Sequence, residues 1–235
     1  MVPSNMDGPA PLEPACRRNT TGGTNWLTYQ PYGVHCACPC NYIRESEATT
    51  VTTTTPSPDL TGDYTLDASH SRVGFVARHA MVTKVRGAFN DVSGTGHFDA
   101  SDPSNSSLSV TIQAKSIDTR NEDRDNHLRS NDFFDMDTYP EITYTSTSVE
   151  AVDATTYRVT GDLTIKGVAK PVTVDFEFTG AAVDPFGNHR IGLEGTVVVN
   201  RKDWGVNWNA ALEAGGVLVS ENVTLEFEVS AIKNG

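Results

Sequence analysis

The feature that most constrains the fold of this chain is the strict alternation of apolar and polar side chains within short segments. It is clearest in residues 70–90, where it occurs twice, with a turn around residues 80–83. One face of the first half would hold Val73, Phe75, Ala77 and His79, and the same face of the second half Val85, Gly87 and Phe89. Because successive side chains point to opposite faces of a strand, this segment predicts two strands with one face toward a core.

The same two-residue period returns along the rest of the chain. It is found in residues 107–114, 157–165, 172–179, 191–199 and 223–230, and turn-forming residues separate these segments. Regular strand spacing over residues 61–235 predicts one all-β domain of eight or so strands. Such a domain is either a sandwich or a closed barrel, and the pattern alone does not choose between them. An eight-stranded barrel has an interior wide enough for packed side chains or for one slender ligand.

One short α-helix interrupts the strands. Residues 121–130 are polar and charged, with Leu128 as their only large apolar residue, so the helix is expected on the surface. Thr119 and Glu122 have the spacing of a capping box, which marks the start of a helix. The adjacent aromatic pair Phe133-Phe134 follows and needs an apolar environment. This pair is interpreted as a lid or plug over one end of the domain.

Charge and hydropathy exclude several classes of protein. The formal charge is −12, and the residues after position 60 hold 15 basic and 25 acidic side chains, or −10 of the total. An acidic chain of this kind argues against a nucleic-acid partner, which needs a clustered basic face. No run of apolar residues exceeds three, so neither a transmembrane segment nor the core of a signal peptide is predicted. We therefore expect a cytoplasmic protein.

Residues 1–60 form a separate region of tail or linker composition, rich in Pro, Thr, Asn and Gly, and we expect them to be disordered. Cys36, Cys38 and Cys40, with His35 beside them, offer ligand types that suit zinc or copper. Only one residue separates neighbouring cysteines, whereas structural zinc loops place at least two between them, so no metal site is predicted. A further hypothesis is that Val51 is the true first residue and that residues 1–50 are not naturally translated.

Five short blocks of sequence stand out when they are taken together and in order. These blocks are residues 67–71 (Asp-Ala-Ser-His-Ser), 85–89 (Val-Arg-Gly-Ala-Phe), 128–135 (Leu-Arg-Ser-Asn-Asp-Phe-Phe-Asp), 161–168 (Gly-Asp-Leu-Thr-Ile-Lys-Gly-Val) and 200–205 (Asn-Arg-Lys-Asp-Trp-Gly). With them the chain resembles the YceI-like family of polyisoprenoid-binding proteins. The resemblance spans roughly residues 62–233. It implies an extended eight-stranded antiparallel lipocalin-like barrel with one helix, an apolar channel that holds an isoprenoid or acyl amphiphile, and a homodimer. Many relatives carry a secretion signal, and none is predicted from this sequence.

The candidate ligand-binding residues mix bulky aromatic side chains with small ones on the predicted inward faces. They are Phe75, Ala77, His79, Phe89, Phe133, Phe134, Leu163, Ile165, Phe176, Phe178 and Trp204. By residue pattern alone, these side chains are better explained as filling the barrel. The resemblance reverses that preference, and the sequence then predicts noncatalytic binding of a long-chain isoprenoid or similar amphiphile, in transport, storage or stress protection. His79 would meet an anionic headgroup, and no cofactor is expected.

Two alternatives remain open at this point. The first is an enzyme that acts on a lipid inside the barrel, with His79 and an acidic neighbour as acid and base. The inward faces show neither paired carboxylates nor histidines at metal-binding spacing, and the group of Asp67, His70 and Ser71 lies in an apparent turn, where a catalytic triad is not favoured. The second alternative is a barrel filled by its own side chains, with a structural or interaction role.

Overall fold

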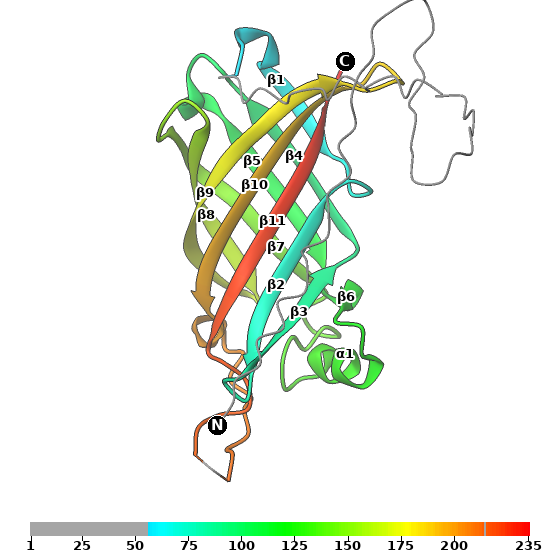
Figure 1. The fold of residues 1–235 in the computed structure, drawn as a ribbon, viewed down its shortest axis with the longest axis vertical. Helices are drawn as coiled ribbons and strands as arrows, with labels where there is room; N and C mark the ends of the chain where they lie inside the picture. Colours follow the sequence, from blue (N-terminus) through cyan, green and yellow to red (C-terminus); the bar gives the residue numbers. More distant parts are fainter. Residues whose placement is uncertain (1–55, 214) are drawn as a thin grey trace, which may run out of the picture. The chain divides into compact units, whose positions relative to one another are not determined.

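The computed structural model describes residues 56–213 and 215–235, and Figure 1 shows their path. The strands are β1 (Gly62–Leu66), β2 (Arg72–His79), β3 (Thr83–Phe89), β4 (Val92–Phe98), β5 (Ser107–Gln113), β6 (Ile117–Asp118), β7 (Glu141–Ala151), β8 (Thr156–Ile165), β9 (Val168–Val183), β10 (His189–Asn200) and β11 (Asn222–Lys233). The helix is α1 (Glu122–Arg129), and four 3₁₀ turns are η1 (Pro58–Leu60), η2 (Pro103–Asn105), η3 (Ala114–Ser116) and η4 (Arg201–Trp204). The predictions made for residues 1–55, including the cysteine cluster and the start at Val51, lie outside the described residues.

The strands close into an antiparallel barrel with eight positions, as predicted. The last residues of β11 pair with β1, where Ala231 lies opposite Leu66, and its first residues pair with β2, where Thr224 lies opposite Val76. Because both pairings are antiparallel, β1 and β2 run in the same direction and share one position in the ring. On their other side β4 pairs with β1 and β3 pairs with β2, so these strands share the next position. The strands β5, β7, β8, β9, β10 and β11 complete the ring.

Alternating burial along the strands confirms the period read from the sequence. In β8, Tyr157, Val159 and Leu163 are buried, whereas Arg158 and Asp162 between them are exposed. The exposed Arg158 forms a two-point ion pair with Asp175 of β9, and both of its N···O distances are 2.8 Å. Apolar side chains thus gather inside the barrel because every second position of each strand faces inward.

Gly87 shows how the backbone makes room for an aromatic wall. A Cβ atom at this position would lie 2.4 Å from Cζ of Phe75 on the neighbouring strand, far closer than two carbons can approach. The space beside Gly87 is therefore occupied by the Phe75 ring. Only a residue without a side chain allows that ring to approach β3 so closely.

The helix α1 forms where the sequence places it, beside β6 at one end of the barrel (Figure 1), but its cap differs from the prediction. The side chain of Asn121 accepts a hydrogen bond from the backbone N–H of Arg124, at 2.9 Å, and so caps the helix. Thr119 instead donates its backbone N–H and its hydroxyl to the buried carboxylate of Asp125, at 3.0 and 2.5 Å. The predicted capping box was wrong because Asp125 reaches back to Thr119. Within the described part of the chain, no helix is long and apolar enough to cross a membrane.

Candidate functional site

The interior of the barrel contains a cavity of about 300 Å³ with an almost entirely apolar wall. This volume lies at the lower end of the range for small-molecule sites in proteins. Ten of the eleven predicted residues line it, namely Phe75, Ala77, Phe89, Phe133, Phe134, Leu163, Ile165, Phe176, Phe178 and Trp204. Their placement on the wall makes them accessible to a ligand, whereas their role in binding stays a prediction.

Two groups of buried side chains form the wall. The group nearer η4 consists of Val73, Val92, Ile112, Ala114, Ile142, Leu163, Val172, Val174 and Trp204. The group toward the other end consists of Tyr64, Val149, Tyr157, Val159, Phe178, Ile191 and Ala231. Tyr144 and Phe176 pack against both groups, so the apolar surface is continuous along the barrel.

Aromatic rings make up much of the wall near α1. Phe89 packs against Phe75 at a centroid distance of 5.9 Å and against Phe134 at 6.0 Å. Phe133 is 5% exposed, and its ring lies 5.1 Å from His127 and 5.2 Å from Trp208. The two phenylalanines after the helix therefore both reach the cavity, as expected of a plug over one end.

The turn η4 positions Trp204 at the same end. Asn200 caps the turn by accepting a 3.0 Å hydrogen bond from the backbone N–H of Lys202, and Gly205 ends it with a φ of 72°. Trp204 is 3% exposed, and its indole N–H donates to the carbonyl oxygen of Leu163 at 2.8 Å. A buried indole needs such a partner, and this bond fixes the ring on the cavity wall.

Arg201 is a wall residue that the sequence analysis missed. It is 7% exposed, and its Nε donates to the carbonyl oxygen of Ser220 at 3.0 Å, while Nη1 donates to the carbonyl oxygen of Val206. Its Nη2 is buried and has no hydrogen-bond partner among the described residues. Burial lowers the pKa of this guanidinium from its ordinary value, and the nearby Glu221 charge opposes that effect. The sequence did contain a signal for the inward direction of Arg201, because Val197, Val199 and Arg201 follow the same two-residue period.

Two tyrosines of the wall, Tyr144 and Tyr64, have their hydroxyl groups hydrogen-bonded to backbone carbonyl oxygens. Tyr144 Oη donates toward the carbonyl oxygens of Val172 and Val159, at 3.1 and 3.2 Å. Tyr64 Oη donates to the carbonyl oxygen of Leu60 at 2.7 Å. Burial raises the pKa of Tyr144 to about 12, with a smaller contribution from the charge of Asp162. Tyr144 thus stays neutral and is unsuited to exchange protons near pH 7.

The structure contradicts the prediction that His79 faces the interior. Its side chain is exposed and is not part of the cavity wall, although Ala77 two residues earlier is. The strand ends at His79, and the backbone turns away through Ala80 and Met81, whose φ angles are 49° and 60°. Alternation holds only while the strand continues, so its last residue lies beyond the rim of the barrel.

The group of Asp67, His70 and Ser71 has a structural arrangement. Asp67 binds His70 at 2.7 Å and also binds Arg190, whereas Ser71 donates its hydroxyl to the carbonyl oxygen of Ser230 at 3.1 Å. Hydrogen bonds from Ser69 and then from Arg190 hold the pKa of Asp67 well below its usual range. Ser71 is therefore not linked to His70, as a catalytic triad would require.

Comparisons with known proteins agree with this architecture. A family model described as a YceI-like domain matches residues 64–231. A UPF0312 protein of Staphylococcus aureus (strain N315) is 41% identical over 170 residues, which cover 72% of this chain and 95% of the relative. This chain therefore spans almost the whole length of that relative.

Solved structures show the same fold. The YceI protein of Campylobacter jejuni is 32% identical with a TM-score of 0.59, and the match covers 67% of this chain and 90% of that one. BcnA of Burkholderia cenocepacia is 26% identical with a TM-score of 0.62, covering 70% and 98%. A polyisoprenoid binding domain from Saccharophagus degradans, 19% identical with a TM-score of 0.56, covers 73% and 98% and supports the fold alone.

Proposed function

This chain belongs to the YceI-like family, and we propose that it binds a long-chain isoprenoid or a similar amphiphile inside its barrel without changing it chemically. The observation that carries this proposal is the continuous apolar cavity along the barrel axis. A lipid-binding role at the level of the family agrees with the likeness to a polyisoprenoid binding domain. Transport, storage and stress protection are the processes that such binding would serve.

The apolar wall supplies the energy for binding a tail. Each methylene group transferred from water to the cavity contributes about 0.8 kcal/mol before the cost of ordering the chain is subtracted. A ligand with a long tail therefore binds with few polar contacts, which matches a wall where the hydroxyl groups of Tyr64 and Tyr144 are already hydrogen-bonded to the protein. The rings of Phe75, Phe89 and Phe134 would contact the tail near α1.

Binding is favoured over catalysis by the groups that the wall presents. Its titratable side chains, within the described residues, are Tyr64, Tyr144, Tyr157, His97 and Arg201. His97 lies at the rim, 40% exposed, and its Nδ1 is 2.7 Å from a carboxylate oxygen of Asp63. Acid and base catalysis requires two groups of suitable pKa near one reacting atom, and this set offers none deep in the cavity.

The test is native mass spectrometry of protein purified from its own cells without detergent, followed by solvent extraction of any released compound. We expect a mass increment at one ligand per chain, and an extracted isoprenoid or acyl compound. The variant Ala77→Phe should reduce this occupancy because it adds a ring to the cavity wall. The matched control Ala169→Phe places the same ring on an exposed position of β9 and should leave occupancy unchanged.

A protein that is empty when isolated and also fails to bind added prenyl lipids would overturn the proposal. The barrel would then be filled by its own side chains. A chemically altered product released from a bound lipid would instead establish an enzyme and contradict the noncatalytic role.

A further inference from the structure

We propose that Arg201 makes the η4 end of the cavity a recognition site for an anionic headgroup, a phosphate or a carboxylate, so that an amphiphile binds in one orientation. This inference rests on the proposed function and names the ligand class for the same cavity. It starts from the unpartnered Nη2 of a side chain that is 7% exposed and lines the cavity.

Arg201 is a buried cation without a carboxylate in direct contact among the described residues. Within the part of the chain that the structure describes, Arg201 forms no ion pair. The acidic residue whose charge acts on it, Glu221, is half-exposed and is bound to Lys202, with 2.5 Å between Nζ and Oε1. A buried cation without an anion is costly in free energy, and it is retained mainly where an anion can reach it.

The geometry of the guanidinium suits an acid group. Two of its three nitrogens are fixed by the carbonyl oxygens of Ser220 and Val206, so the third has a defined direction before any ligand arrives. A guanidinium pairs with phosphate or carboxylate oxygens through short, charge-assisted hydrogen bonds. Because the side chain is held in place, little rotamer entropy is lost on binding.

Access to Nη2 requires a small adjustment of the cavity wall. The atom is enclosed by protein, and Val206 and Val219 line the same cavity. Both belong to the segment after η4 that Arg201 itself anchors through Val206 and Ser220. We therefore expect a headgroup to displace side chains of this segment while the barrel strands stay in place.

The opposite end of the cavity does not offer an equivalent site. The hydroxyl of Tyr64 is used by the carbonyl oxygen of Leu60, and His97 is paired with Asp63. The wall toward that end also includes the neutral hydroxyl side chains of Thr95, Ser107 and Tyr157, so what distinguishes the η4 end is the one arginine among the described wall residues. The headgroup would lie at η4, and the tail would extend toward Phe178 and Tyr157.

The experiment compares three ligands with the same C20 tail, namely geranylgeraniol, geranylgeranoic acid and geranylgeranyl phosphate, by isothermal titration. We expect wild-type protein to bind at least one of the charged ligands about tenfold or more tightly than the alcohol, the usual size of a charge-assisted hydrogen bond. Arg201→Gln should remove this preference, so that the alcohol, the acid and the phosphate bind with affinities within about twofold of one another. The two charged ligands distinguish a phosphate from a carboxylate.

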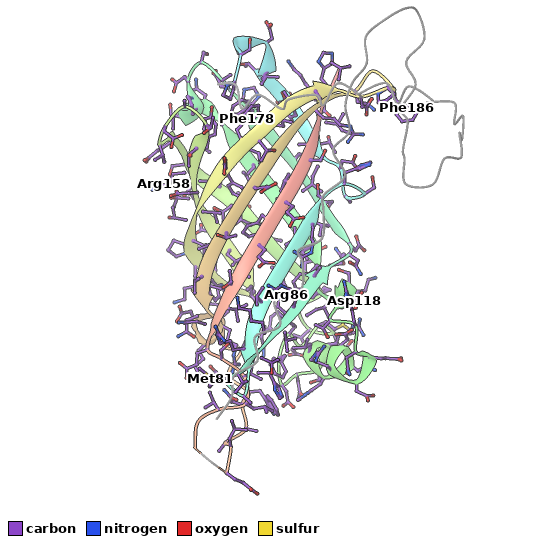
Figure 2. The ribbon with its side chains drawn as sticks, viewed as in Figure 1. Met81, Arg86, Asp118, Arg158, Phe178 and Phe186 are labelled. Carbon is purple, nitrogen blue, oxygen red and sulfur yellow. The ribbon has the colours of Figure 1, made fainter. Side chains whose placement is uncertain are left out.

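The matched control is Arg158→Gln, which removes one positive charge from an exposed position on the outer face of β8 (Figure 2). It should keep the full preference. If Arg201→Gln does not fold, the comparison of ligands on wild-type protein and on Arg201→Lys still tests the inference, because the lysine keeps the charge.

Equal affinities of the wild type for alcohol, acid and phosphate would overturn the headgroup site and leave the proposed function standing. A preference that survives in Arg201→Gln would also overturn it. Failure of all three ligands to bind would count against the proposed function itself, so the two failures are distinguishable.

Discussion

The two ends of strand β10 each carry an arginine, and the surroundings of the two side chains are opposite. Arg190, the second residue of β10, lies between Asp67 and Asp184. Its Nε is 2.7 Å from Asp184 Oδ2. Arg201 follows the last residue of the strand and is held by two carbonyl oxygens, without a carboxylate. The first arginine completes a network on the outside of the barrel. The second leaves one donor unused beside the apolar cavity, which is the pattern of a binding group.

The comparison extends to the packing at each end. Near η4 the cavity ends in Trp204 and in the ring cluster of Phe133, His127 and Trp208. Toward the other end the wall contains Phe98 and Tyr157, whose rings meet edge to face at 5.4 Å. Beyond it, Phe186 at the β9–β10 turn is 89% exposed (Figure 2). Large aromatic side chains thus pack together at the η4 end, whereas the aromatic side chain of the turn beyond the other end is exposed to solvent.

The largest effect, a loss of stability, is expected from Trp204→Ala at the η4 end of the cavity. The substitution removes a ring that is 3% exposed, together with its bond to Leu163, and deletion of such a ring costs about 3–5 kcal/mol of the free energy of unfolding. Urea denaturation measures this change. The control Phe186→Ala should alter the free energy by less than about 0.5 kcal/mol, since its ring is exposed. Similar losses in both variants would contradict the contrast between the ends.

A smaller effect is expected from Phe178→Trp, which enlarges a 2% exposed ring on the cavity wall away from η4. If headgroups lie at η4, only long tails reach this position. We expect about tenfold weaker binding of C40 prenyl ligands, the size of a moderate overpacking penalty, and unchanged binding of C15 ligands. Titration over a series of tail lengths checks this result.

The matched control for that series is Phe186→Trp, the same substitution at an exposed position. It should not change binding at any tail length. A uniform loss of affinity for all lengths in Phe178→Trp would show that the tail does not run from η4 toward Phe178.

The smallest effect is a dependence of stability on pH that arises at Asp67, the carboxylate bound by Ser69 and Arg190. Ser69 and Arg190 lower the pKa of Asp67 in the folded state, so its stabilising contribution is complete above the unfolded value of about 3.9 and is lost as the pH falls below it. Urea denaturation at pH 5 and at pH 2.5 should therefore show a smaller loss of stability for Asp67→Asn than for the wild type.

The control for the acid series is Ser148→Asn, which places the same amide at an exposed position of β7 and removes no carboxylate. Its loss of stability between the two pH values should equal that of the wild type. Equal behaviour of Asp67→Asn and the wild type would show that the Asp67–Arg190 pair contributes nothing to folding.

The alternation of apolar and polar side chains predicted the cavity wall correctly where the strands are long. Phe176 and Phe178 lie in the sixteen residues of β9, where alternation is maintained, and both line the cavity as predicted. His79 was wrong because it is the last residue of its strand and the chain turns at Ala80. Arg201 was missed for the converse reason. It lies one residue beyond β10 yet keeps the inward direction, although an arginine is rarely buried.

The sequence by itself determined the all-β class, the inward face of most strands, the single helix and the membership of the family. These features depend on side-chain periodicity and short motifs, which are local. Only the tertiary structure decided that β11 closes the ring on β1 and β2, that Asp125 displaces the expected cap, and that Arg201 is enclosed. Those outcomes depend on contacts between residues far apart in the chain or on where a strand stops, and no local pattern specifies them.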